Sequence, residues 1–427
     1  MEEKQRKHRD FIQNVAIALL AVLAVILFAQ TQLYNLGLDI GSSYFGRLTG
    51  VPVQTDTAAD GQLSDLAMPV RVAVTGTYGR YANVTLTTGD KELFSPLSTL
   101  LCGILGSAQA YTPCSGQEFL DALSGPSVYY DFLSPLPVSV IAGLVDAEWD
   151  IALSARWLVV SGQKDTVVLY LLDDTGRYLR CATAVSVSDL DEAVSHYELG
   201  TAMFAFDMAE TDDHYQNIAP CSLFPAELPT LPCLSVSGSL SDASWLLNAL
   251  GFNPNTKNRY TESSGTEVIM EGERSLYIRP DNSIYYQSGG ETYLTINAAE
   301  DIPTLREAAA GTGLLLNALL SHVPSDAGLY LESIRQSGST TVLCFEYQVN
   351  GVPVRLSSGC AAEVTLSGNS VSTLSLRFRQ YTAANENSLL LPLRQAAAIA
   401  ARQKGAELTI GYADNGSSTI SASWLAD

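Results

Sequence analysis

The residue types that most often catalyse reactions are sparse in this chain, and their spacing predicts no active site. The histidines are His8, His196, His214 and His322. None has a second histidine four residues away or belongs to an H-E-x-x-H zinc motif. The hydrolase motif G-x-S-x-G and the phosphate-binding loop G-x-x-x-x-G-K-S/T are missing as well. We therefore predict no catalytic residues, no cofactor, no metal ligands and no enzyme activity.

Ser161 and Lys164 have the S-x-x-K spacing of penicillin-binding enzymes. In those enzymes the companion motifs S-D-N and K-T-G complete the site, and both are missing here. The pair also falls between two predicted strands, at residues 156–160 and 166–172, rather than at the start of a helix. We interpret it as part of a hairpin loop.

Acidic pairs and tyrosines follow patterns that suit surfaces and sheets. Adjacent acids occur at Asp173-Asp174, Asp191-Glu192 and Asp212-Asp213. In so acidic a chain they are typical of solvated turns rather than of acid/base pairs. Tyrosines on the strand-rich segment include Tyr277, Tyr285, Tyr286 and Tyr293. They indicate half-buried sheet faces, and a sheet that binds a partner is the alternative.

The cysteines are seven in number, and none forms a C-x-x-C pair. They are Cys102, Cys114, Cys181, Cys221, Cys233, Cys344 and Cys360. Zinc and iron–sulfur sites need closely spaced pairs, so this pattern disfavours both. Two interpretations stay open: small buried apolar residues, or local disulfides Cys102–Cys114 and Cys221–Cys233 in an oxidising compartment.

Composition restricts the class of protein. Hydrophobic residues make up 47% of the 427, which allows a large core and excludes bulk disorder. The net charge is -21, and no cluster of lysine and arginine interrupts the acidic folded part. Such a surface repels the phosphate backbone, so we predict no binding to nucleic acid.

An uncharged segment near the N-terminus predicts a membrane anchor. In residues 11–29 only Gln13 and Asn14 are polar. As a helix this stretch would be roughly 28 Å long, about the thickness of a hydrocarbon core. Tyr34 stands where an interfacial aromatic residue would lie. We therefore predict a transmembrane helix over residues 11–34.

Charges around this segment predict its orientation. Lys4, Arg6, Lys7 and Arg9 precede it, and the next charge after it is Asp39. The positive-inside rule makes residues 1–10 a cytoplasmic tail and places the rest outside the cell membrane. A cleaved signal peptide is the alternative, but the segment is long for one and no clear small-x-small cleavage site follows it.

The predicted fold is α+β, with an ectodomain of antiparallel sheets and packed helices. Residues 35–68 form a linker, 69–235 an N-terminal domain and 236–427 a C-terminal domain. We expect a helix with Ser95 as N-cap and Pro96 at its first position, and a short helix capped by Ser188. Another helix is expected to open at Asp301.

The C-terminal half contains a short sequence that occurs twice, which indicates a duplication. The sequence Leu-Leu-Asn-Ala-Leu occurs at residues 246–250 and again at 315–319, each time on a predicted helix before strands. Two repeats, 240–300 and 301–427, would explain this. Asn350-Gly351 predicts a tight hairpin, because both residues tolerate positive φ.

This layout resembles the YycH/YycI family of Gram-positive regulators, and the longer YycH type in particular. The matching features are the basic tail with its single span, the block at 128–137, the segment 246–254, the strand 275–278 and the segment 345–354. The order of these features along nearly the whole chain carries the likeness. The resemblance also predicts further strand after Ser423-Trp424.

The resemblance implies a regulator without catalytic residues, acting on a sensor histidine kinase that controls cell-wall metabolism in a two-component system. It implies docking on that kinase and on a YycI-like membrane protein. In the span, Ala16, Ala21 and Ala24 supply small residues for helix packing, so we expect them to bind the partner. The alternative is an anchored envelope module that binds a wall fragment or inhibits a secreted protease.

Overall fold

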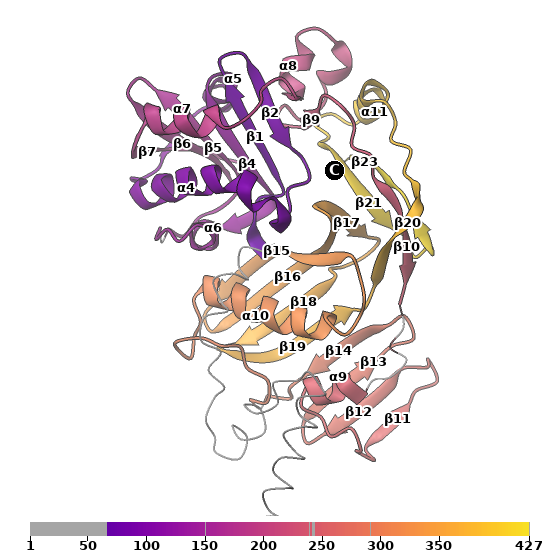
Figure 1. Ribbon diagram of the computed structural model, residues 1–427. Helices are drawn as coiled ribbons and strands as arrows, with labels where there is room; N and C mark the ends of the chain where they lie inside the picture. The colour runs from indigo at the N-terminus through magenta and orange to yellow at the C-terminus, as the bar shows by residue number, and fades with distance from the viewer. Residues whose placement is uncertain (1–65, 150, 239, 241–243, 291, 427) are drawn as a thin grey trace, which may run out of the picture. The chain divides into compact units, whose positions relative to one another are not determined.

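Helices and mostly antiparallel strands build the described chain, as predicted for an α+β protein (Figure 1). The computed structural model describes residues 66–149, 151–238, 240, 244–290 and 292–426. Within these ranges no helix combines the length and the apolar character needed to cross a membrane. The predicted tail (1–10), the transmembrane helix (11–34) and the linker up to residue 65 lie outside them.

The N-terminal part forms a seven-stranded antiparallel sheet with the order β2-β1-β4-β5-β6-β7-β3. Its strands are β1 (Arg71–Gly76), β2 (Gly79–Asn83), β3 (Thr112–Pro113), β4 (Ser127–Pro137), β5 (Ser154–Gln163), β6 (Thr166–Asp173) and β7 (Tyr178–Ser186). Residues 167–171 of β6 are all buried. This continuous burial requires cover on both faces of the sheet.

Helices supply that cover. They are α4 (Lys91–Ser107), α5 (Gly116–Ser124), α6 (Val138–Leu144) and α7 (Val187–Ser195). The apolar residues of α4, α6 and α7 share one cluster with Val128 and Val160 of the sheet. On the opposite face, Phe119 of α5 packs with Tyr129 and Tyr170. The result is a three-layer arrangement in which α4 and α7 contact each other on one face.

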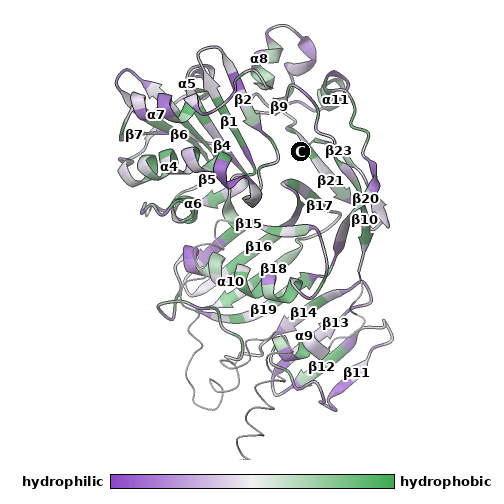
Figure 2. Cartoon of the chain, viewed as in Figure 1, coloured by the Kyte–Doolittle hydropathy of each residue, from purple (hydrophilic) through white to green (hydrophobic). Residues whose placement is uncertain are grey.

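The C-terminal part forms an eleven-stranded sheet with the order β11-β12-β13-β14-β19-β18-β16-β17-β21-β23, and β15 pairs with β16. Its strands are β11 (Arg259–Thr261), β12 (Glu267–Glu271), β13 (Arg274–Ile278), β14 (Ser283–Gln287), β15 (Ala327–Ser337), β16 (Thr340–Val349), β17 (Val352–Leu356), β18 (Ala362–Ser367), β19 (Ser370–Arg377), β21 (Leu408–Asp414) and β23 (Ala422–Ala426). Only the β17–β21 pair is parallel. The central strands are hydrophobic, whereas β11 at the edge is hydrophilic (Figure 2).

The remaining helices and strands complete the described chain. They are α8 (Ala205–Ala209), α9 (Ser244–Ala249), α10 (Leu305–Leu320), α11 (Leu393–Ala400), η1 (Thr88–Asp90), η2 (Asp213–Tyr215), the pair β8 (Ala202–Phe204) and β9 (Leu223–Pro225), and the sheet of β20 (Gln380–Asn387), β10 (Pro232–Ser237) and β22 (Thr419–Ile420). The predicted domain boundary at 235/236 falls inside β10, and all described residues belong to one compact unit. The division into two domains stays a prediction.

Three predicted helices begin at a different residue than expected: α4, which is described with the site below, α7 and α10. α7 follows Ser186 rather than Ser188, and α10 follows Thr304 rather than opening at residue 301. In both, an acid three residues later completes a capping box by accepting hydrogen bonds from the cap residue. The reciprocal bonds satisfy two amide donors at once, which a lone serine at 188 would not do.

The predicted hairpins and repeats have different outcomes. Asn350 and Gly351 join β16 to β17 with φ angles of 49° and 76°, which confirms the tight turn. The long strand β15 was not predicted. Residues 246–249 lie on the short helix α9, and 315–319 lie on the much longer α10. The duplication therefore stays a prediction.

A disulfide joins Cys344 and Cys360, and the alternative interpretation of local disulfides Cys102–Cys114 and Cys221–Cys233 is wrong. Cys102 and Cys114 are free because they pack in the clusters on opposite faces of the seven-stranded sheet. Cys221 lies in the cluster with α5, while Cys233 is beside Ser421 in the three-stranded sheet.

Candidate functional site

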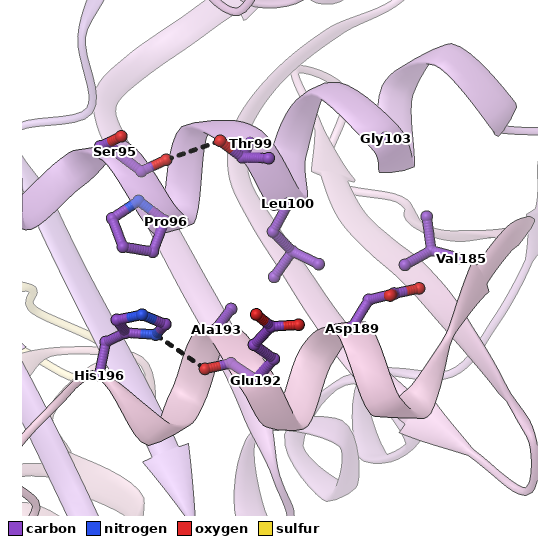
Figure 3. Close-up of a pocket in the computed structure, with 10 residues that line it drawn as sticks. All are labelled: Ser95, Pro96, Thr99, Leu100, Gly103, Val185, Asp189, Glu192, Ala193 and His196. Carbon is purple, nitrogen blue, oxygen red and sulfur yellow. Dashed lines mark hydrogen bonds between the residues drawn. The ribbon is translucent and has the colours of Figure 1, made fainter.

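An open groove of about 410 Å³ lies between α4 and α7 (Figure 3). It is lined by Ser95, Pro96, Thr99, Leu100 and Gly103 of α4, by Val185 of β7, and by Asp189, Glu192, Ala193 and His196 of α7 and its C-cap. Leu100 and Ala193 are each only 6% exposed and, with Pro96 and Val185, form an apolar floor. Polar side chains of the two helices lie on both sides of this floor.

The spacing of the lining residues follows from the two helices. Residues 95, 99 and 103 stand one turn apart on α4, so they form one ridge. The helices run in opposite directions, with Pro96 facing His196 and Gly103 at the end nearest Val185 (Figure 3). Gly103 has no side chain, so the ridge does not protrude at this position. A Cβ there would be 3.5 Å from a methyl of Val185, which is an ordinary contact.

Pro96 lies in the second turn of α4 and not at its start, so the predicted helix start was wrong. The reason is the turn η1, where Thr87 and Asp90 form a capping box that leads the chain into α4 at Lys91. Proline has no amide hydrogen, so it offers none to the carbonyl of Glu92 one turn earlier.

Two polar side chains of the groove, Thr99 and His196, already donate their hydrogens to backbone carbonyls. Thr99 donates its hydroxyl hydrogen to the Ser95 carbonyl at 3.0 Å. His196 Nδ1 lies 2.8 Å from the Glu192 carbonyl, and because a carbonyl only accepts, Nδ1 carries the hydrogen. In the neutral ring, Nε2 is then an acceptor.

Asp189 and Glu192 add carboxylates to the α7 side of the groove, where both residues are exposed. Hydrogen bonds from the hydroxyl and the amide of Ser186 lower the pKa of Asp189. Asp189 therefore stays ionised and holds the cap of α7. No lysine or arginine occurs among the ten lining residues. The groove thus combines an apolar floor with hydrogen-bond acceptors.

A buried network of charges lies elsewhere, between the two large sheets. Arg71 of β1 pairs with Asp131 of β4 and, at 2.7 Å, with Glu407 just before β21. Arg156 of β5 lies 3.0 Å from Asp131 and 2.6 Å from Glu407. Two cations and two anions therefore balance one another, and they tie the seven-stranded sheet to the end of the eleven-stranded one.

Electrostatics keeps this network ionised. Burial opposes ionisation of Asp131, but Arg156 and Arg71 outweigh it and lower its pKa to about 2. Burial likewise opposes ionisation of Glu407, and Arg71 and Arg156 again lower the pKa. A carboxylate held ionised by two arginines is a poor proton acceptor, so the arrangement suits structure rather than acid/base chemistry.

The residues singled out in the sequence have separate locations. Ala16, Ala21 and Ala24 lie outside the described residues. Ser161 lies in β5, is 5% exposed, and its hydroxyl is 3.5 Å from the Pro126 carbonyl. Lys164 has a φ of 55° in the β5–β6 turn, which confirms the hairpin for Lys164, whereas Ser161 belongs to the paired strand rather than to the loop.

The groove was missed in the sequence. Glu192 was interpreted as part of a solvated acidic pair, and none of the ten lining residues was predicted to bind a partner. A signal existed in Ser95, Thr99 and Gly103, which place small residues one turn apart on a helix whose other face is leucine-rich. Such a ridge lets a further helix approach closely. No family model matches the chain, and no similar curated protein or solved structure was found.

Proposed function

We propose that this protein is a membrane-anchored, extracytoplasmic docking protein that regulates a partner by contact. The observation that carries the proposal is the α4–α7 groove, which combines an apolar floor with exposed acceptors and packs on the seven-stranded sheet. Such a groove is suited to recognising another chain. The resemblance to YycH makes the partner a sensor histidine kinase that governs cell-wall metabolism, with a YycI-like protein as a second contact.

The proposal requires the ectodomain to lie outside the membrane. The basic tail before residues 11–29 predicts an N-in, C-out single span. We expect a C-terminal alkaline phosphatase fusion to be active and to sediment with membranes. A matched fusion lacking residues 1–29 should stay in the cytoplasm and be inactive. Active enzyme in a soluble, shortened form would instead identify a cleaved signal peptide.

Contacts within the bilayer are the second part of the proposal. Ala16, Ala21 and Ala24 are small residues near one face of the predicted span. We expect Ala21→Leu combined with Ala24→Leu to reduce kinase co-purification from solubilised membranes by roughly five- to tenfold, because larger side chains separate the helices. The amount recovered is measured by quantitative mass spectrometry of the captured complex.

Val22→Leu is the matched control, because it enlarges a neighbouring side chain of the same span and should leave kinase recovery unchanged. Both variants should remain inserted in the membrane. If no membrane kinase accompanies the wild-type chain, the proposed function fails. If the kinase accompanies every variant equally, the coupling does not run through this alanine face.

The second candidate is an envelope module that binds a wall fragment, and one observation favours it. Cross-strand register brings Tyr260, Tyr277 and Tyr285 to one face of β11–β14, with Val268 between the first two. Tyr277 and Tyr285 lie with ring centroids 6.0 Å apart, and Tyr260 is 53% exposed. Flat aromatic faces of this kind suit sugar rings. Pull-down with purified wall material, with and without Tyr260→Ala, separates this candidate from the first.

A further inference from the structure

We infer that the α4–α7 groove takes a cationic amphipathic helix from a partner protein. The inference rests on the proposed docking function and names the partner segment that the groove would hold. It follows from three features of the groove: the supply of hydrogen-bond acceptors, the absence of any free backbone edge in the helices that form it, and its length.

Acceptors decide the charge of the occupant. Thr99 and His196 donate their hydrogens to neighbouring carbonyls. Asp189 and Glu192 place carboxyl side chains on the α7 side of the groove. A bound segment must therefore supply donors, and lysine and arginine side chains do so while also balancing negative charge.

Backbone chemistry decides the conformation of the occupant. An extended peptide needs a strand edge with which its amides and carbonyls can pair. Apart from Val185 of β7, the groove is lined by α4 and α7 with its C-cap, and most backbone groups of these helices bond within each helix. A helix satisfies its own backbone, so it can lie along the floor with only its side chains in contact. The occupant is therefore helical.

Length decides how much of that helix is recognised. Ser95 and Gly103 are eight positions apart on α4, or about 12 Å at the helical rise. Two apolar side chains one turn apart fit this distance and would lie over Leu100 and Ala193. Lysines or arginines beside them would reach Glu192 and Asp189. This gives the pattern of an apolar pair flanked by cations.

The test uses the full-length chain in phosphatidylcholine nanodiscs and a fluorescent helical peptide of about 18 residues, made of leucine and lysine with leucine on one face. Binding is followed by fluorescence anisotropy at about 0.15 M salt. We expect saturable binding that weakens about tenfold in Glu192→Lys. Gly103→Leu should abolish it by filling the groove, while leucine favours the helix and keeps the chain folded.

Asp191→Lys is the matched control, because residue 191 is an exposed acid on the same helix but does not line the groove. Its affinity should stay within about twofold of wild type. Equal weakening by Glu192→Lys and Asp191→Lys would overturn the inference in favour of non-specific attraction to an acidic chain. Equal binding of a leucine–glutamate peptide would overturn it as well.

Failure of this inference can be told apart from failure of the proposed function. The peptide titration concerns the groove alone, while kinase co-purification measures whether a membrane partner exists. A kinase that is retained equally by wild type, Glu192→Lys and Gly103→Leu leaves the docking function in place and removes the groove from it. Loss of kinase in both groove variants, with retention in Asp191→Lys, supports both.

Discussion

Replacing Asp131 with asparagine is expected to lower the free energy of unfolding by about 3–5 kcal/mol. Asp131 is 1% exposed and contacts both Arg71 and Arg156. Its Oδ1 also accepts the amide of Leu133 at 2.8 Å. Asparagine can keep the bond to Leu133 but removes the charge, so two buried arginines would face the single carboxylate of Glu407. Urea unfolding of the full-length chain in detergent, followed by tryptophan fluorescence, measures the loss.

Two further variants separate charge from a general effect of substitution. Asp174→Asn makes the same change at an exposed residue of the β6–β7 turn and should alter stability by less than about 0.5 kcal/mol. Adding Arg156→Gln to Asp131→Asn restores equal numbers of cations and anions and should recover part of the loss. A loss below about 1 kcal/mol in Asp131→Asn would show that the network contributes little net stability.

The same network predicts how stability depends on pH. The folded pKa of Asp131 is lowered to about 2, and an unfolded aspartate titrates near 4. The stabilising contribution is therefore present above about pH 4 and is lost as the pH falls towards 2. Asp131→Asn should flatten the stability curve over this window, since the titrating group is gone.

Local chemistry explains which parts of the fold the sequence could predict. The Asn350-Gly351 turn and the hairpin between β5 and β6 both depend on residues close together in the chain. The class, α+β with mostly antiparallel sheets, follows from the same patterns. β15 was missed because residues 327–337 mix apolar and polar side chains without strict alternation, and its long pairing with β16 determines its structure.

Long-range contacts explain what the sequence could not predict. The Arg71–Glu407 bond joins residues 336 apart, and neither side chain belongs to a local motif. Cys344 and Cys360 meet only because β16 and β18 are paired neighbours in the sheet. The groove exists only because α4 and α7 lie side by side. The sequence shows which residues each helix contains, but it does not show that the two helices are neighbours. A candidate site formed by two helices can therefore be recognised only once the fold is known.

Replacing Gly351 with valine is expected to destabilise both large sheets together. At φ 76° a β-branched residue is strained, which costs about 1–3 kcal/mol. A Cβ at this position would also lie 2.3 Å from the carbonyl oxygen of Thr85, in the segment after β2. Backbone cannot move aside as a flexible side chain would, so the crowding adds roughly another 1–3 kcal/mol. Sequence alone would confine this defect to the C-terminal half.

Gly176→Val separates strain from crowding, because Gly176 has a φ of 80° in the β6–β7 turn and nothing within 4 Å of an added Cβ. It should show the strain cost alone. Limited proteolysis of both variants, with fragments identified by mass spectrometry, reports which part of the chain opens. In Gly351→Val we expect cleavage sites in β1–β4 and in β15–β19 to become accessible at the same protease concentration. Accessibility confined to β15–β19 would mean that the hairpin contact with Thr85 does not couple the two sheets.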